Sequence, residues 1–245
     1  MVLSIFQFMI TMILAMVCGQ TIGLSANELP FITLIIPALW IFPRNGVAGI
    51  VLLVAMAIYG MTLAYQPASL SVSMWVLFPL MMVAFSRSSN LGIMVVSGLI
   101  LLTLQVGIMV TQSAGKLDGM PSITLIQLFS VMAMWWAANS WKLSSHRNWW
   151  ALALLIPLWI AEATFAVLLA LCMTGLIALV NDLAKVSQFN WAKLLCWTLP
   201  AIAFMVVVIS PAIDVPNSVF VVWLCLLATA WMTDYLLKST EEPIS

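Results

Sequence analysis

The sequence predicts an all-α fold: a polytopic transmembrane helix bundle of about ten spans with short loops, arranged as a five-plus-five inverted repeat. Hydrophobic residues make up 64% of the 245 residues and charged residues 7%, with a mean hydropathy of +1.17, which is typical of an integral membrane protein. Apolar stretches recur from end to end, so residues 1–245 are predicted to form one membrane domain. A weak internal similarity at an offset of about 120 residues indicates two related halves.

Seven apolar segments are long enough to predict helices: Val2 to Gly19, Val47 to Tyr65, Ser71 to Phe85, Leu91 to Thr111, Ile123 to Ser140, Leu194 to Ser210 and Val219 to Trp231. The first of them has no basic n-region and no clear small-x-small cleavage site, so we expect a retained helix and not a signal peptide.

A shorter segment, Phe31 to Phe42, lies between the first two of these and ends at the turn signal Pro43-Arg44-Asn45-Gly46. At 1.5 Å per residue it covers roughly 18 Å, which is less than a bilayer core. We therefore expect a span in a thin region, a broken helix, or a helix extended through Asn27 to Pro30.

The run from Trp149 to Val180 contains 32 residues and one acid, Glu162. It is either one long tilted helix or a hairpin of two short helices that turn near Glu162. The positive-inside rule favours the hairpin. With ten spans, seven of the eight Lys and Arg residues lie on the side of both termini, and Lys116 alone lies on the other side. The seven are Arg44, Arg87, Lys142, Arg147, Lys185, Lys193 and Lys238. The prediction is a multi-pass protein of a bacterial-type inner (plasma) membrane with both termini cytoplasmic.

The two predicted halves are residues 1–112 and 120–236, followed by a polar tail at 237–245. Two short segments of the first half resemble segments of the second half. The first pair is Ser4-Ile5-Phe6-Gln7-Phe8 and Thr124-Leu125-Ile126-Gln127-Leu128, and the second pair is Leu34-Ile35-Ile36-Pro37 and Leu154-Leu155-Ile156-Pro157. An odd number of spans per half inverts the second half relative to the first. The alternative is chance recurrence of Leu, Ile and Pro in an apolar chain.

Three glutamines lie within predicted spans, where lipid cannot satisfy an amide. The repeat relates Gln7 to Gln127, and Gln105 lies in the middle of the fifth helix. Each of the three either forms an interhelical hydrogen bond, which contributes roughly 0.6–2 kcal/mol, or lines a substrate cavity.

Two short helices each contain a proline, Pro37 and Pro157, with Trp40 and Trp159 close by. Paired short or interrupted helices point to a transporter's binding site, although prolines are also simply tolerated in membrane helices. We therefore add these four residues to the glutamines as the candidate cavity lining. Glu162 is either a turn residue at the outer surface or a proton or cation coupling site.

The sequence offers no candidate catalytic or metal-binding set. No ionisable residue lies at the centre of a predicted span, and the chain has one histidine and no GxSxG motif. The four cysteines lie in apolar segments without a CxxC pair, and the methionines are scattered through the spans without a pattern of MxxM clusters on one face. We therefore expect neither an enzyme nor a cofactor. Zero net charge without a basic run makes nucleic acid an unexpected partner.

These features favour a small inner-membrane transporter of a neutral or amphipathic organic solute, with a cavity between two inverted halves. Its expected partners are the lipid bilayer and either that solute or another membrane protein. One alternative is a non-catalytic membrane subunit that scaffolds or regulates a partner protein. A third is a flippase for lipids or lipid-linked substrates that uses Arg44, Arg87 and Arg147 at the rim. A water-accessible cavity lined by the glutamines would separate transporter from scaffold.

Overall fold

The computed structural model describes residues 2–25, 28–41, 47–86, 89–140, 148–186 and 189–241, and within these ranges it contains helices and no strand. Seven helices are long and apolar enough to cross a membrane: Val2–Ser25, Val47–Tyr65, Leu91–Ser113, Pro121–Asn139, Thr164–Ala184, Trp191–Ile209 and Asn217–Ser239. Two shorter apolar helices span Ala68–Ala84 and Trp149–Ile160. By helix length and composition, the chain is a multi-pass helical membrane protein.

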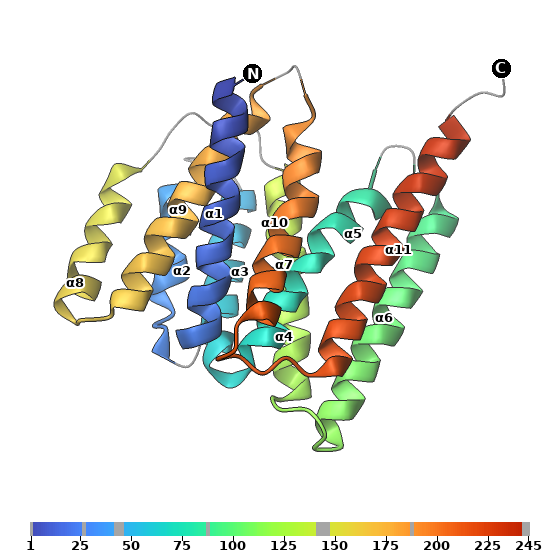
Figure 1. The fold of residues 1–245 in the computed structure, drawn as a ribbon, viewed down its shortest axis with the longest axis horizontal. Coiled ribbons are helices and arrows are strands. Elements are labelled where there is room, and N and C mark those ends of the chain that lie inside the picture. The colour runs from blue at the N-terminus through green and yellow to red at the C-terminus, as the bar shows by residue number, and fades with distance from the viewer. Residues whose placement is uncertain are drawn as a thin grey trace.

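In its described part, the first half of the chain contains five helical segments (Figure 1). The first three are α1 (Val2–Ser25), α2 (Ile32–Trp40), and α3 (Val47–Thr62) with η2 (Leu63–Tyr65). The fourth is continuous through α4 (Ala68–Ser73), η3 (Met74–Val76) and α5 (Leu77–Ala84), and the fifth is α6 (Leu91–Ser113). The second half also contains five: α7 (Pro121–Ser140), η4 (Trp149–Leu154) with α8 (Leu155–Ile160), α9 (Thr164–Ala184), α10 (Trp191–Ile209) and α11 (Asn217–Glu241). Successive segments alternate in direction, so α1 begins and α11 ends at the same edge, the upper edge of Figure 1.

The short second helix, α2, is nine residues long and contains Pro37. It begins at Ile32, and Leu29 and Pro30 before it are not helical, so the possible extension through Pro30 is wrong. Proline restricts the residue before it to extended conformations, which explains why the helix begins only after Pro30.

The apolar run from Trp149 to Val180 forms two helices, as the charge distribution predicts. The α8 helix ends at Ile160, and α9 begins at Thr164. Between them Glu162 has φ +57°, the left-handed conformation that commonly ends a helix. The N–H of Ala163 donates to the Leu158 carbonyl at 3.1 Å, and that of Glu162 to the Trp159 carbonyl at 3.0 Å. These two bonds form the Schellman closure of a helix, so the turn is built into the hairpin.

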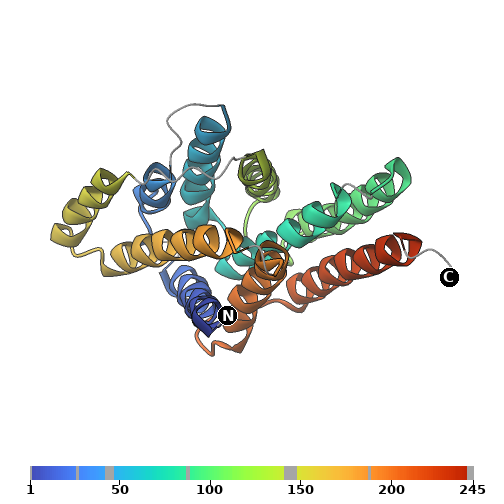
Figure 2. The same ribbon diagram turned by 90° about the horizontal axis from the view of Figure 1, so that it is seen from above.

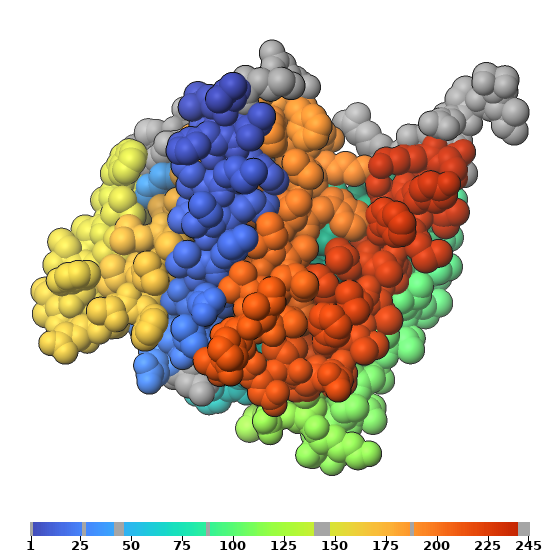
Figure 3. All heavy atoms as spheres, viewed as in Figure 1, coloured from blue at the N-terminus to red at the C-terminus, as the bar shows by residue number. Residues whose placement is uncertain are grey.

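The core of the bundle joins helices that are far apart in the sequence (Figure 2). The most extensive packing is between α3 and α7 and between α1 and α9, and α1 also packs along α10. The α6 and α11 helices lie together on one flank with α5, whereas α8 lies at the opposite flank against α9. Figure 3 shows the same face with its side chains, with α8 and α9 at the left and α11 at the right. The centre of the molecule is therefore formed by α1, α3, α7, α9 and α10.

The described lysines divide between the two edges as the ten-segment arrangement predicts. Lys185 pairs with Asp182 at 3.1 Å near the end of α9. On α11, Asp234 accepts from Lys193 of α10 at 2.7 Å and from Lys238 at 2.9 Å. All these groups are at the upper ends of their helices, whereas Lys116 lies in the turn between α6 and α7 at the other edge. Four further basic residues lie outside the described residues: Arg44, Arg87, Lys142 and Arg147.

Candidate functional site: a central apolar cavity

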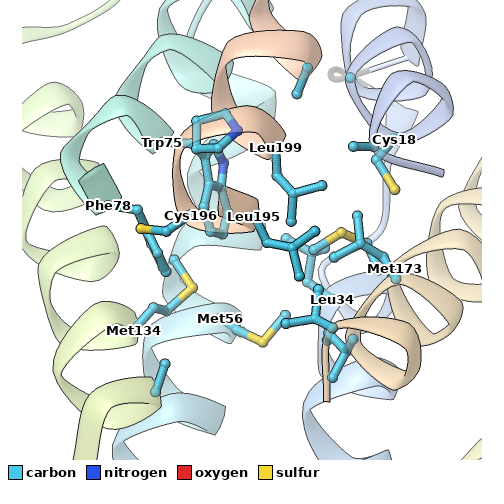
Figure 4. Close-up of a pocket in the computed structure, with 18 of the residues that line it drawn as sticks. Cys18, Leu34, Met56, Trp75, Phe78, Met134, Met173, Leu195, Cys196 and Leu199 are labelled. Atoms are coloured by element: carbon cyan, nitrogen blue, oxygen red, sulfur yellow. The ribbon is translucent and has the colours of Figure 1, made fainter. Parts of the chain in front are cut away.

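A cavity of about 380 Å³ lies at the centre of the bundle. Both halves of the chain line it: α1, α2, α3 and the α4–η3–α5 segment from the first half, and α7, α9 and α10 from the second. Figure 4 shows side chains that converge on this space from these helices, among them Trp75, Phe78, Met134, Met173 and Leu199. The cavity is therefore a feature of the interface between the two halves.

The exposed residues of the cavity lining lie toward the upper edge of the bundle. Ala138 and Ala192, at the upper ends of α7 and α10, line it and are exposed. Deeper lining residues such as Ala15, Met56 and Tyr59 are buried. The mouth is therefore at the edge that carries Lys185, Lys193 and Lys238.

A small hydrogen-bonded cluster, which includes the lining residues Tyr59 and Trp75, lies where α3, α4, η3 and α7 meet. The hydroxyl of Tyr59, which is 0% exposed, donates to the Ser71 carbonyl at 2.8 Å. The same hydroxyl accepts from the indole N–H of Trp75 at 2.9 Å. Gln127 of α7 donates from Nε2 to the Ser71 hydroxyl at 2.9 Å. Because low polarity strengthens hydrogen bonds and makes unpaired groups costly, this cluster fixes how the two halves meet.

A second buried cluster closes the lower edge where α6 turns into α7. Gln66 donates to the Thr124 hydroxyl, which donates to Gln112 Oε1 at 2.7 Å. Gln66 Oε1 also accepts from the Met120 N–H at 3.3 Å. At Gly119, with φ +96°, a Cβ would lie 2.5 Å from Gln66 Oε1, so only glycine fits this turn without a shift. The joint between the halves is thus held by buried amides.

The α1 helix approaches α10 closely through Gly19, which lines the cavity, and one turn below Gly23 faces Ile213 in the turn after α10. A Cβ on Gly19 would lie 2.5 Å from the Ala203 carbonyl oxygen, and one on Gly23 would meet the Ile213 side chain. Glycines four residues apart in an apolar helix are the GxxxG pattern that allows close backbone packing. This contact joins the first half directly to the second.

The three glutamines predicted to line a cavity are not among its lining residues. Gln7 is half-buried near the upper end of α1, and Gln105 is buried on α6 with its carbonyl oxygen unpaired. Gln127 is completely buried and bonds to Ser71 across the interface between α7 and α4. The structure therefore does not bring the three together, and Gln127 has the interhelical hydrogen bond that was the alternative interpretation.

The predicted proline and tryptophan residues separate into two environments, and none of them lines the cavity. Pro37 and Trp40 are buried in α2. The ring of Trp40 packs edge-on against that of Trp149, with ring centroids 6.1 Å apart and an interplanar angle of 87°. Pro157 and Trp159 are exposed on α8. Glu162 is also exposed, at the lower turn between α8 and α9.

The lining has the chemistry of an apolar binding site. The described residues that line it include no Asp, Glu, Lys, Arg or His, and their side-chain heteroatoms are mainly sulfur, from Cys18, Met56, Met134, Met173 and Cys196. Among the described residues, no group of three or more His, Cys, Asp and Glu side chains is placed to hold a metal ion. The arrangement can bind a hydrophobic or aromatic molecule by shape, but a charged group would enter it at a large desolvation cost.

Sequence reasoning missed the residues that build this site. Tyr59, Ser71 and Trp75 are not among the candidate residues that the sequence predicts. Two signals were nevertheless present: serines at alternate positions, Ser69, Ser71 and Ser73, at the start of an apolar helix, and the spacing of Gly19 and Gly23. The apolar lining itself gives no signal, because the same residue types fill the core and face the lipid.

No protein-family model, curated protein or solved structure significantly matches this chain.

Proposed function

We propose that this protein is a small transporter in a bacterial-type inner membrane, and that its solute is a neutral or amphipathic organic molecule. The observation that carries the proposal is the central cavity of about 380 Å³ between the two halves of the chain. Pockets for small molecules typically measure about 300–1,000 Å³ and are mostly apolar. Because Gln7, Gln105 and Gln127 do not line this cavity, the proposal rests on the size of the cavity and on its position between the halves, and the scaffold subunit stays the alternative.

An inverted repeat of ten spans is part of this proposal, and the packing of the helices supports it. If the five segments from α1 to α6 correspond in order to the five from α7 to α11, then α1 corresponds to α7 and α3 corresponds to α9. Exchanging the two halves therefore turns the contact between α1 and α9 into the contact between α7 and α3. These are the two most extensive contacts in the bundle. The cavity also receives the first, third and fourth segments of each half. Transporters built from inverted repeats bind their substrates at such a repeat interface.

The chemistry of the lining supports an uncharged solute. Because no charged side chain is among the described lining residues, a phosphate, carboxylate or ammonium group would lose its hydration there without gaining a partner among them. The exposed mouth is at the edge where Lys185, Lys193 and Lys238 lie. The positive-inside rule assigns this edge to the cytoplasm, so the cavity of this conformation would face inward.

The first test is transport by purified protein in proteoliposomes, with Leu199→Trp and Leu102→Trp as matched variants. Leu199 lines the cavity, whereas Leu102 is 60% exposed on α6 and faces away from the core. We expect Leu199→Trp to lower uptake of neutral aromatic and aliphatic solutes at least about fivefold, because the indole fills the space where solute binds. Leu102→Trp should keep wild-type uptake.

Equal uptake by both variants would contradict a pathway through the cavity. No uptake of any solute by folded wild-type protein, together with co-purification of a partner whose stability depends on this chain, would favour the scaffold subunit. Uptake restricted to lipid analogues would favour the flippase.

The ten-span topology predicts opposite labelling of two introduced cysteines. In a variant without the four native cysteines, Glu162→Cys should react with a membrane-impermeant maleimide added to intact cells, because Glu162 is exposed at the lower turn. Ala192→Cys, at the upper cavity mouth, should react only after lysis. Labelling of both from the same side would contradict the ten spans, and the reverse pattern would place the basic edge outside.

A further inference from the structure

One wall of the cavity consists of three aromatic rings in contact. The rings of Tyr59 and Trp75 meet edge-on, with centroids 5.5 Å apart and an interplanar angle of 76°. Those of Trp75 and Phe78 are 5.3 Å apart and tilted by 33°. All three residues line the cavity, and they come from α3, η3 and α5. The rings support one another, so this wall is more rigid than one of aliphatic side chains.

The polar atoms of this wall are already used within it. The indole N–H of Trp75 donates to Tyr59, whose hydroxyl donates to the Ser71 carbonyl. Tyr59 is completely buried, whereas Trp75 and Phe78 are only half-buried and so leave part of their surface uncovered. This wall therefore presents ring surface to the cavity without a free hydrogen-bond donor. It can select a ligand by its shape and apolar surface, but not by hydrogen bonds to the ligand.

Three thioethers are also part of the cavity lining, among aliphatic side chains. Met56 of α3, Met134 of α7 and Met173 of α9 all line the cavity, and Figure 4 shows them with Trp75 and Phe78 around it. Methionine sulfur makes favourable contacts with the edges of aromatic rings, and its unbranched side chain adapts to ligands of different outline. A planar ligand would thus meet ring faces on one side and sulfur at its edge.

We propose that the cavity binds an uncharged planar aromatic molecule of about two or three fused rings, packed against Trp75 and Phe78 and contacted by the three methionines. This inference rests on the proposed function and names its solute class. The size follows from the volume of about 380 Å³, near the lower end of the range for small-molecule sites. The described lining residues carry no charge, which selects for an uncharged molecule.

The test uses the full chain in nanodiscs and the fluorescent probe 1-aminoanthracene, with empty nanodiscs as background. Two competitors share one carbon skeleton and differ in aromaticity: phenanthrene and perhydrophenanthrene. We expect phenanthrene to displace the probe at about fivefold lower concentration, since aromatic and sulfur contacts add modestly to simple burial. Phe78→Leu should reduce that preference to less than about twofold, and Met134→Leu should weaken it partly. Phe129→Leu is the matched control, because Phe129 is 60% exposed on α7 and should leave it unchanged.

Each outcome decides between the inference and the function on which it rests. Equal displacement by the two competitors would overturn the aromatic preference but leave a transporter of other apolar solutes intact. Saturable binding that persists unchanged in Leu199→Trp would overturn the cavity as the binding site. No saturable binding to wild-type protein would overturn this inference, and transport of aliphatic solutes in proteoliposomes would then decide the proposed function separately.

Discussion

Replacing Gly19 with alanine is expected to destabilise the bundle by about 2–3 kcal/mol and to lower transport with it, because overpacking against backbone forces two helices apart. The new Cβ would lie 2.5 Å from the carbonyl oxygen of Ala203, in the backbone of α10, which cannot turn away as a flexible side chain can. Since Gly19 also lines the cavity, a displaced α1 changes the shape of that space.

The measurement for Gly19→Ala is unfolding of the purified protein in mixed micelles, followed by tryptophan fluorescence, together with uptake in proteoliposomes. Gly98→Ala is the matched control, because nothing lies within 4 Å of a Cβ at that position on α6. It should be neutral or slightly stabilising, since alanine favours a helix more than glycine does. Equal stability of the two variants would show that α1 and α10 do not approach as closely as described.

Tyr59→Phe is expected to lower the free energy of unfolding by about 2 kcal/mol, because it leaves a buried donor without its acceptor. The indole N–H of Trp75 would lose the Tyr59 oxygen that lies 2.9 Å away, and the Ser71 carbonyl would lose a donor at 2.8 Å. The ring itself remains, so the aromatic packing against Trp75 is kept and the effect reports the hydroxyl alone.

Tyr65→Phe serves as the control for Tyr59→Phe, since Tyr65 is 64% exposed at the end of η2. Its stability should stay within about 0.5 kcal/mol of wild type, as for most surface substitutions. A double-mutant cycle of Tyr59→Phe with Trp75→Phe then isolates the bond between the two side chains. Strict additivity of the two substitutions would refute the coupling described here.

The candidate site was harder to predict from sequence than the helices that build it. Hydropathy located the helical segments because long apolar runs are needed to cross a bilayer, and the positive-inside rule favoured a turn near Glu162, where the structure has one. The same reasoning gave weight to Gln7, Gln105 and Gln127 as rare polar groups. Their side chains lie outside the cavity lining, and Gln127 instead joins α7 to α4. A polar side chain in a membrane span predicts that a hydrogen-bond partner is needed, but it does not predict which group that partner is.

The sequence by itself determined that this is a helical multi-pass membrane protein and favoured the turn near Glu162, because these properties depend on composition and on charge along the chain. Only the tertiary structure decided which apolar helix faces pack against one another and which line the central cavity. Lipid, core and cavity all select the same side chains, so Met56, Met134 and Met173 differ from other methionines only by position. Where helices approach within backbone contact, as at Gly19, and where they diverge around a ligand-sized volume, depends on packing between residues far apart in the sequence.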